Sequence, residues 1–243
     1  MIMNTKTRTA GTLRMGISSF LERNRHALLL LYFLIYLPWF SWLEKTVTTH
    51  FHVIHVALDD LIPFCEYFIV PYLLWFGYVA WGIAYFYRKE RGEYFRLCAM
   101  LFTGMTVFLL ISTFYPNGHY LRPATFERSN LFVQLVQWLY ETDTSTNLFP
   151  SIHVYNSLAV NIAVWHCDSF RGGELKKRAV RYGSAALAFS IVLATMFLKQ
   201  HSVFDVVTGI VMAVFLYTIV YGNVLARIPL RQQKYRQENL HRV

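Results

Sequence analysis

Near the carboxyl end of the chain, the stretch "LKQHSVFD" (198–205) places three ionisable residues beside a long apolar run. They are a cation, Lys199, an imidazole, His201, and a carboxylate, Asp205. His201 and Asp205 are four residues apart, so a helix would put both side chains on one face. A carboxylate there can hold one imidazole nitrogen protonated and leave the other free to attack, as in a catalytic triad. The spacing predicts a histidine nucleophile with an orienting acid.

Two other polar clusters border apolar runs. "YPNGHYLRPATF" (115–126) contains Arg122, and "NLFPSIH" (147–153) contains Ser151 and His153. The planar fork of an arginine suits phosphate oxygens. A serine at the start of a helix lies beside free backbone N–H groups that favour anions, and a histidine exchanges protons near neutral pH. Together these residue types predict phosphoryl transfer, in which positioning and charge stabilisation dominate.

Each of these residues also has an ordinary structural interpretation. Ser151 is typical of a helix cap, and Asp205 of a favourable charge at a helix N-terminus. Lys199 is typical of a side chain that extends to the membrane interface, and Arg122 of a loop ion pair. Only the convergence of all of them on one side of the molecule favours a catalytic site.

The elements that must position these residues are membrane helices. The chain has 243 residues, of which 55% are hydrophobic and 15% are charged, whereas soluble domains carry about 25% charged residues. Residues 48–62 are too short and polar to cross a bilayer and are interpreted as an external or interfacial segment. Six apolar runs have the length of about 17–25 residues that a crossing needs: 27–43, 67–87, 97–115, 148–166, 181–198 and 203–226.

The basic residues orient this map. All but four of the 23 Lys and Arg residues lie in the N-terminal arm, in the loops after the second and fourth runs, or in the C-terminal tail. This bias predicts that those segments, and both termini, are cytoplasmic, so the three polar clusters meet at the external face. The predicted organisation is a cytoplasmic arm (1–26), a transmembrane domain (27–226) and a cytoplasmic tail (227–243). The four exceptions are Lys45, Arg122, Arg128 and Lys199.

Other interpretations of the composition are less favoured. The net charge of +9 is spread over short segments that flank helices, which indicates topology and attraction to anionic lipid instead of nucleic-acid binding. No small-residue cleavage site follows the first apolar run, so it is interpreted as an uncleaved span. His119 is interpreted as an interfacial residue, and the aromatic residues of the second and third runs as interfacial belt and packing. The three cysteines, Cys65, Cys98 and Cys167, show neither metal-ligand spacing nor a disulfide framework.

The three clusters resemble the signature of the type 2 phosphatidic acid phosphatase (PAP2) superfamily of membrane lipid phosphatases and phosphotransferases. That signature has a Lys, six residues and Arg-Pro, then Pro-Ser-Gly-His, then Ser-Arg, five residues, His, three residues and Asp. This chain matches it at Arg122-Pro123, at "PSIH" (150–153), and at "HSVFD" (201–205) with the same spacing. The resemblance covers residues 100–220.

The chain departs from the signature at four positions. Tyr115 stands where the superfamily has its first Lys, and Ile152 stands where it has Gly. Ala194 and Thr195 stand where it has Ser-Arg, and Lys199 is expected to supply the missing charge. The combination of "FPSIH" with "KQHSVFD" is similar to a variant that recurs in this superfamily.

The resemblance implies an all-α polytopic membrane protein, a PAP2-like bundle of six transmembrane helices with its active site at the external face. It implies that His201 attacks phosphorus and forms a phosphohistidine while Asp205 orients its ring. His153 would protonate the leaving oxygen and then activate water. No metal or cofactor is implied. The positions implied to contact the phosphate of the substrate are Arg122, Ser151, Lys199 and Tyr115.

The function implied is hydrolysis of a phosphomonoester or diphosphate on a membrane lipid: phosphatidic acid, phosphatidylglycerol phosphate or a polyprenyl diphosphate. Two alternatives stay open. One is a lipid headgroup phosphotransferase similar to inositol phosphorylceramide or sphingomyelin synthases, and the other is a non-catalytic transporter or lipid-binding protein. The expected partners are the bilayer and its lipid, with no nucleic acid, and a homo-oligomer is left open. The expected location is a bacterial cytoplasmic membrane.

Overall fold

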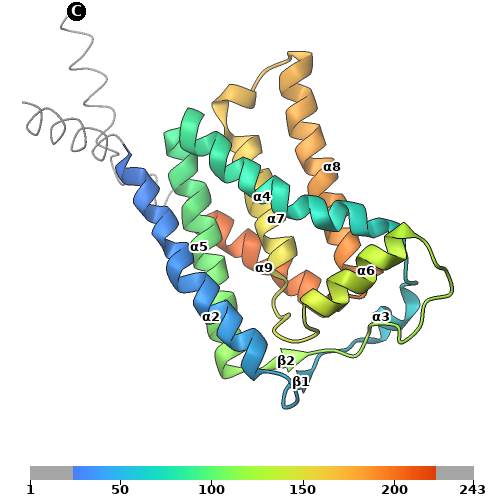
Figure 1. Cartoon of the computed structure of the whole chain (residues 1–243). Helices are drawn as coiled ribbons and strands as arrows, with labels where there is room; N and C mark the ends of the chain where they lie inside the picture. The colour runs from blue at the N-terminus through green and yellow to red at the C-terminus, as the bar shows by residue number, and fades with distance from the viewer. Residues whose placement is uncertain (1–23, 223–243) are drawn as a thin grey trace, which may run out of the picture.

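A computed structural model describes residues 24–222 and shows helices joined by short connections (Figure 1). The strands β1 (His52–Val53) and β2 (Asn117–Gly118) form a parallel pair in which His52 lies opposite Asn117. The predicted C-terminal tail and nearly all of the predicted N-terminal arm lie outside the described residues. The helices are η1 (Arg25–Tyr32), α2 (Phe33–Thr46), α3 (Ala57–Leu61), η2 (Glu66–Phe68), α4 (Ile69–Lys89), α5 (Arg91–Phe114), α6 (Leu131–Thr142), α7 (Ile152–His166), η3 (Asp168–Phe170), α8 (Leu175–Phe197) and α9 (Val203–Val220).

Five helical stretches in the described part of the chain are long and apolar enough to cross a membrane, and they indicate an integral membrane protein. They are Arg25–Thr46, Glu66–Lys89, Arg91–Phe114, Leu175–Phe197 and Val203–Val220. The sequence predicted six, and the run 148–166 is the one that differs. Its helix, α7, starts only at Ile152 and has 15 residues, which is a length of about 22 Å against a hydrocarbon thickness of about 30 Å.

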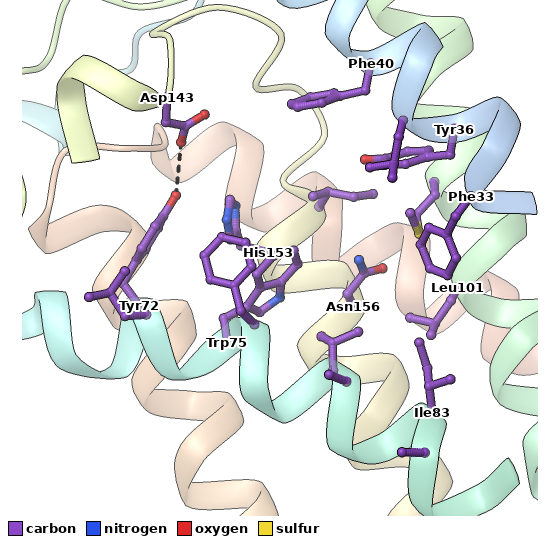
Figure 2. Close-up of a pocket in the computed structure, with 18 of the residues that line it drawn as sticks. Phe33, Tyr36, Phe40, Tyr72, Trp75, Ile83, Leu101, Asp143, His153 and Asn156 are labelled. Atoms are coloured by element: carbon purple, nitrogen blue, oxygen red, sulfur yellow. Dashed lines mark hydrogen bonds between the residues drawn. The ribbon is translucent and has the colours of Figure 1, made fainter. Parts of the chain in front are cut away.

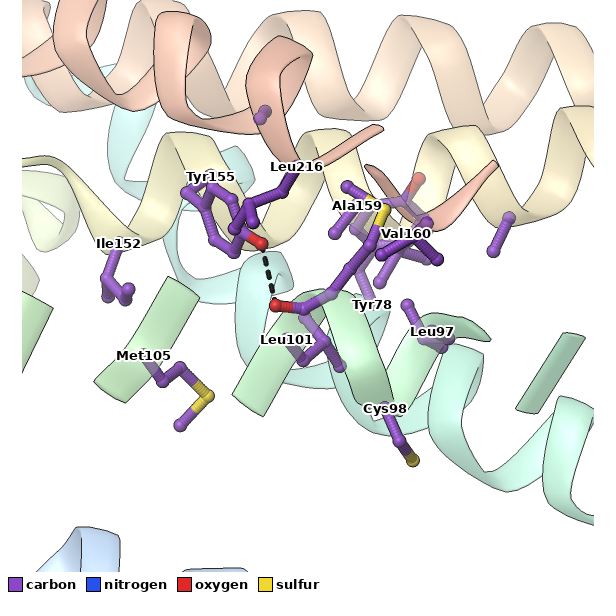
Figure 3. Close-up of a cluster of buried hydrophobic side chains, with 14 of the residues drawn as sticks. Tyr78, Leu97, Cys98, Leu101, Met105, Ile152, Tyr155, Ala159, Val160 and Leu216 are labelled. Carbon is purple, nitrogen blue, oxygen red and sulfur yellow. Dashed lines mark hydrogen bonds between the residues drawn. The ribbon is translucent and has the colours of Figure 1, made fainter. Parts of the chain in front are cut away.

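Helix α7 lies in the centre of the bundle and packs against α4, α5, α8 and α9 (Figure 1). It is apolar and buried on several faces, as expected of a helix surrounded by others. The hydroxyl of Tyr155 donates a hydrogen bond to the Met100 carbonyl at 2.6 Å, which joins α7 to α5 (Figure 3). A Cβ at Gly104 would lie 2.1 Å from the Tyr155 ring, so only glycine allows α5 to approach this closely. These contacts fix the position of α7 along the bundle, and with it the position of His153 in the first turn of α7.

A layer of short elements covers one end of the bundle and contains β1, β2, α3 and α6 (Figure 1). The connection between the third and fourth apolar runs contains the 12-residue helix α6. The side chain of Asn130 caps α6 by accepting a hydrogen bond from the Val133 N–H group at 2.9 Å. Helix α6 buries an apolar face against α4 and α8, and the buried members of this cluster are Ile69, Tyr72, Val136, Leu139, Ala194 and Leu198.

The connection from α6 to α7 is held by buried polar side chains. The carboxylate of Glu44 accepts a hydrogen bond from Asn147 Nδ2 at 3.0 Å. The side-chain oxygen of Asn117 accepts hydrogen bonds from the backbone N–H groups of Leu148 and Phe149 at 2.8 and 2.9 Å. Because buried backbone groups need partners, these bonds stabilise the irregular segment that leads into α7.

Candidate active site

His201 and Asp205 lie together at the start of α9. His201 belongs to the short turn before α9, and Asp205 is the third residue of α9. His201 Nδ1 lies 3.5 Å from Asp205 Oδ2, and both side chains are buried. The same carboxylate accepts a hydrogen bond from the Ser202 N–H group at 3.0 Å, which forms a capping box. Asp205 therefore has the position of a helix cap and also faces the imidazole, and its catalytic role remains a prediction.

His153 reaches the other side of the same imidazole. It lies in the first turn of α7, and its Nδ1 is 3.3 Å from Nε2 of His201. Its ring packs against the rings of Tyr72 and Trp75 on α4, with centroids 4.7 and 4.4 Å away. The structure thus arranges Asp205, His201 and His153 in a row, although 48 residues separate the two histidines.

The surroundings of His201 favour its neutral form. Burial and, second to it, the positive charge of Arg122 lower the pKa of His201 to about 3, while a hydrogen bond with the backbone of Leu148 opposes the shift. The imidazole is therefore neutral at neutral pH. With its Nδ1 facing the carboxylate, the lone pair of a neutral imidazole lies on Nε2, which faces His153. This arrangement gives a nucleophilic nitrogen beside a proton donor.

Ser151 connects α7 with α9. Its hydroxyl oxygen accepts a hydrogen bond from the Val154 N–H group at 3.4 Å, so it is the N-cap of α7. Its backbone N–H group donates to the carbonyl oxygen of Asp205 at 3.1 Å. A Cβ at Gly209 would lie 2.9 Å from the Ser151 carbonyl oxygen, so the two helices approach closely here. The capping interpretation is confirmed, and the contact with phosphate remains a prediction.

Arg122 is bound by the connection that follows α6. Its Nη1 donates to the carbonyl oxygens of Tyr140 and Asp143 at 3.2 and 2.8 Å. Its Nη2 donates to the carbonyl oxygen of Thr144 at 2.8 Å and to Gln200 Oε1 at 2.7 Å. Its guanidinium also lies over the Tyr140 ring, 4.5 Å from the centroid. Arg122 therefore anchors the end of α6 to Gln200, the residue beside His201. Its positive charge also lowers the pKa of His201.

Lys199 is bound by the short helix α3 and the residue after it. Its ammonium donates to the carbonyl oxygen of Asp59 at 2.7 Å and to that of Ile62. The carboxylate of Asp59 also accepts hydrogen bonds from Ser202 Oγ at 2.6 Å and from the Val203 N–H group at 2.7 Å. Asp59 thus ties α3 to the turn that carries His201. The sequence interpretation missed Asp59, although the adjacent aspartates of the short external segment 48–62 were a signal.

Tyr115 lies at the end of α5 and stacks on His52, with ring centroids 4.2 Å apart. This places it at the strand pair, and its side chain is exposed. It is not one of the residues that the structure brings together around His201. A contact between Tyr115 and a substrate therefore remains only a prediction.

His119 is fully buried, so its interpretation as an interfacial residue is wrong. Its Nδ1 accepts a hydrogen bond from the Leu121 N–H group at 3.2 Å, so its Nε2 donates to the carbonyl oxygen of Gln200 at 2.9 Å. Burial lowers the pKa of His119 to about 4. It supports Gln200, the residue directly before His201. Nothing in its sequence spacing indicated this contact.

A cavity of about 800 Å³ opens beside His153 (Figure 2). His153 and Asp143 lie at its polar end, where Asp143 Oδ2 accepts a hydrogen bond from the Tyr72 hydroxyl at 3.3 Å. From there it follows α4 to Arg88. The wall is mostly aromatic and aliphatic, so the interpretation of Trp75 as packing alone is incomplete. Further wall residues are Phe33, Tyr36, Phe40, Ile83, Leu101 and Met105.

Within residues 24–222, no group of three or more His, Cys, Asp or Glu side chains is placed to hold a metal ion. Cys65, Cys98 and Cys167 are free thiols.

Comparison with known proteins gives one match. The family model described as the PAP2 superfamily matches residues 122–229. The matched segment begins at Arg122 and contains Ser151, both histidines of the row and Asp205. No curated protein and no solved structure matches the chain significantly.

Proposed function

Because residues 122–229 belong to the PAP2 superfamily, which acts on phosphate esters, we propose that this protein is a membrane-embedded phosphatase that hydrolyses a lipid phosphate through a phosphohistidine. The observation that carries the proposal is the row of Asp205, His201 and His153 at the polar end of a long apolar cavity. The row supplies the chemistry, and the cavity supplies room for the hydrocarbon.

In the first step, Nε2 of His201 attacks phosphorus. The N–P bond forms while the bond from phosphorus to the lipid oxygen breaks. His153 enters this step as the protonated imidazolium and gives its proton to that oxygen, so that the lipid leaves as an alcohol and His153 becomes neutral. The proton on Nδ1 of His201 stays between the imidazole and Asp205, whose carboxylate stabilises the positive charge that the ring gains. This assignment rests on the distances of 3.5 and 3.3 Å on the two sides of the imidazole.

In the second step, water replaces the histidine. His153 has lost its proton and now accepts one from the attacking water, whose oxygen forms a bond to phosphorus. The N–P bond breaks, inorganic phosphate leaves, and both histidines return to their starting states. One residue acts first as general acid and then as general base, as its position beside Nε2 of His201 allows.

The negative charge of the phosphoryl group is balanced by fixed positive partial and full charges. The first turn of α7 starts at Ile152 and His153, and N–H groups at a helix N-terminus favour anions. Arg122 acts through its charge, which already influences the pKa of His201. The hydroxyl hydrogen of Ser151 is free to donate because its oxygen serves as the acceptor of the cap. Lys199 contributes through the position of the turn, since its ammonium is bound to carbonyl oxygens.

The cavity supports a substrate with a long hydrocarbon chain. It borders α4 from Tyr72 to Arg88, which corresponds to roughly 24 Å of helix at the usual rise per residue. Apolar cavities of this kind bury hydrocarbon and orient it through a few polar groups at one end. A phosphate bound at the two histidines would therefore lie at the His153 end of the cavity, and the hydrocarbon chain of the lipid would extend from there along α4.

We further propose that α7 with its flanking residues provides a sixth crossing, so that both termini face the cytoplasm and the histidines face outward across a bacterial cytoplasmic membrane. The position of α7 among α4, α5, α8 and α9 supports this assignment. The basic residues of the connections from α4 to α5 and from α7 to α8, at the ends of these helices away from the histidines, support the orientation.

The test is phosphate release by the purified full-length protein in detergent, with EDTA present. The lipids are phosphatidic acid, phosphatidylglycerol phosphate and a polyprenyl diphosphate. We expect release from at least one of them, loss of release in His201→Ala, and a decrease of about 10²–10⁴-fold in His153→Ala. His166→Ala is the matched control, because His166 lies at the other end of the same helix and packs on Tyr221.

The outcomes separate the alternatives. Undiminished release in His201→Ala would contradict the phosphohistidine. If folded protein releases no phosphate from any lipid but transfers labelled phosphoryl headgroup to an added alcohol, the protein is a headgroup transferase that uses the same histidines. If it does neither and still binds lipid, the non-catalytic alternative holds.

A further inference from the structure

Asp143 is a partly buried acid that the proposed mechanism does not use. It directly follows α6 and lies at the polar end of the cavity, together with Tyr72 and His153 (Figure 2). Its Oδ2 accepts one hydrogen bond, from the Tyr72 hydroxyl at 3.3 Å. The ring of Tyr72 in turn packs against His153. The carboxyl group therefore lies one side chain away from the proposed proton donor.

The charged groups around Asp143 leave its carboxyl group with unused hydrogen-bonding capacity. Arg122 bonds to the carbonyl oxygen of Asp143 and not to its carboxylate. Burial raises the pKa of Asp143 to about 6, the charge of Arg122 opposes that shift, and the charge of Glu44 adds to it. The ionised form is therefore the larger fraction at pH 7. An ionised carboxylate accepts about four hydrogen bonds, and a carboxylate in apolar surroundings is costly unless those bonds are made.

The position of the Asp143 carboxyl group limits which hydrogen-bond donors can reach it. The phosphoryl group lies at the two histidines in the proposed mechanism, and the hydrocarbon lies along α4. Asp143 borders the space between them, which the atoms nearest the phosphate ester would occupy. A second phosphate in that space would be repelled by the carboxylate, whereas a hydroxyl or amide N–H group would be attracted.

We propose that Asp143 forms a subsite that accepts a hydrogen bond from a hydroxyl or amide N–H group on the lipid backbone, next to the phosphate ester. The inference rests on the proposed function and narrows it. The preferred substrate is a lipid phosphomonoester with such a donor, and lipids without one, including polyprenyl diphosphates, are poorer substrates. A site that bonds to a polar substrate group discriminates strongly against the analogue that lacks it, because its own polar group is then left without a partner.

The experiment uses two matched pairs of lipids with the full-length protein in detergent. One pair is 1-acylglycerol 3-phosphate and the corresponding 1-acyl-1,3-propanediol phosphate, which lacks only the hydroxyl. The other pair is an N-acylethanolamine phosphate and the corresponding acyloxyethyl phosphate, which has an ester oxygen in place of the amide N–H group. In at least one pair we expect kcat/KM to be about tenfold or more higher for the lipid with the donor. The pair that responds identifies the donor as hydroxyl or amide.

Variants then assign the preference to this residue. Asp143→Ala should bring the ratio of the two kcat/KM values close to one, and Asp143→Asn should lower it several-fold, because a neutral amide oxygen is a weaker acceptor than a carboxylate. Glu141→Ala is the matched control. Glu141 is an exposed acid in the last turn of α6, two residues before Asp143, and it does not border the cavity. The ratio should therefore keep its wild-type value in this variant.

Wild-type ratios near one in both pairs, with both lipids hydrolysed, would overturn the subsite and leave the proposed function intact. Failure of the folded protein to hydrolyse any of the four lipids, or those of the earlier panel, would instead count against the proposed function. A wild-type ratio retained in Asp143→Ala would also overturn the subsite. If that variant does not fold, the same ratio retained in Asp143→Asn decides against it.

Discussion

Replacement of Asp59 by alanine should destabilise the turn that carries His201. The carboxylate of Asp59 is buried and accepts hydrogen bonds from the N–H groups of Val56 and Val203 at 2.9 and 2.7 Å and from Ser202 Oγ at 2.6 Å. Two backbone N–H groups would lose their acceptor. Both N–H groups are partly buried, so the lower part of the range of about 1–3 kcal/mol for each donor left without a partner applies, and the expected cost is about 2–3 kcal/mol of unfolding free energy.

The same change should also slow the reaction. Ser202 directly follows His201 and caps the helix that carries Asp205. If this turn shifts, the nucleophile moves relative to its orienting carboxylate, and a displacement of about 1 Å can cost about 10²-fold in rate. We therefore expect kcat to fall in Asp59→Ala by more than KM rises, because the substituted residue lies behind the nucleophile.

Both effects are measurable on one preparation. Unfolding in detergent can be followed by the reaction of the thiols of Cys98 and Cys167, which are buried in the folded protein, and phosphate release gives kcat. Asp60→Ala is the matched control, because Asp60 is the exposed neighbour whose carboxylate bonds only to His55 at 2.9 Å in the described part of the chain. That change should cost about 0.5 kcal/mol or less. An Asp59→Ala protein with wild-type stability and kcat would refute the reasoning.

Three further changes test other parts of the structure. Arg122→Lys should cost about 2 kcal/mol and lower kcat/KM, because one ammonium cannot reach the four acceptors that the guanidinium holds; Arg128→Lys, at an exposed arginine that pairs with Glu66, is the control in the same unfolding assay. Gly104→Ala would push a methyl group into the Tyr155 ring and should cost about 1–3 kcal/mol, so an unchanged unfolding temperature would contradict the packing of α5 on α7. The pKa of His119 is about 4 in the folded protein and 6.5 ordinarily, so the unfolded chain takes up the proton first as pH falls. The folded protein should therefore lose stability between pH 6.5 and pH 4. An equal loss of stability over that window in His119→Gln would show that this histidine is not responsible.

Much of the site could be predicted from the sequence because its chemistry is local. The spacing of His201 and Asp205 placed both beside the start of one helix, and the structure brings Nδ1 and Oδ2 within 3.5 Å. Hydropathy alone located five of the membrane helices. The family match covers the segment in which the motifs were found. These features depend on neighbouring residues or on the solvent that a segment needs, and both can be read along the chain.

The sequence did not show which polar side chains also hold other parts of the protein in place. Lys199 was expected to supply charge to a phosphate, but its ammonium is bound to carbonyl oxygens at α3, whose residues precede it by more than 130 positions. His119 had no informative spacing and is nonetheless buried against Gln200. Such pairings are long-range, and their partners are set by how the external segments fold over the end of the bundle.

The sequence by itself determined an apolar helical protein with a histidine and an acid at the mouth of its last helix, because periodicity, charge and spacing are properties of single segments. Only the tertiary structure decided that α7 lies at the centre of the bundle, that His153 meets His201, and that Asp143 closes the polar end of a cavity beneath α6. The physical reason is that these contacts join segments whose distance in space is fixed by the close packing of α5, α7 and α9 and by the hydrogen bonds of the covering layer. The distance between these segments cannot be read from any pattern of neighbouring residues in the sequence.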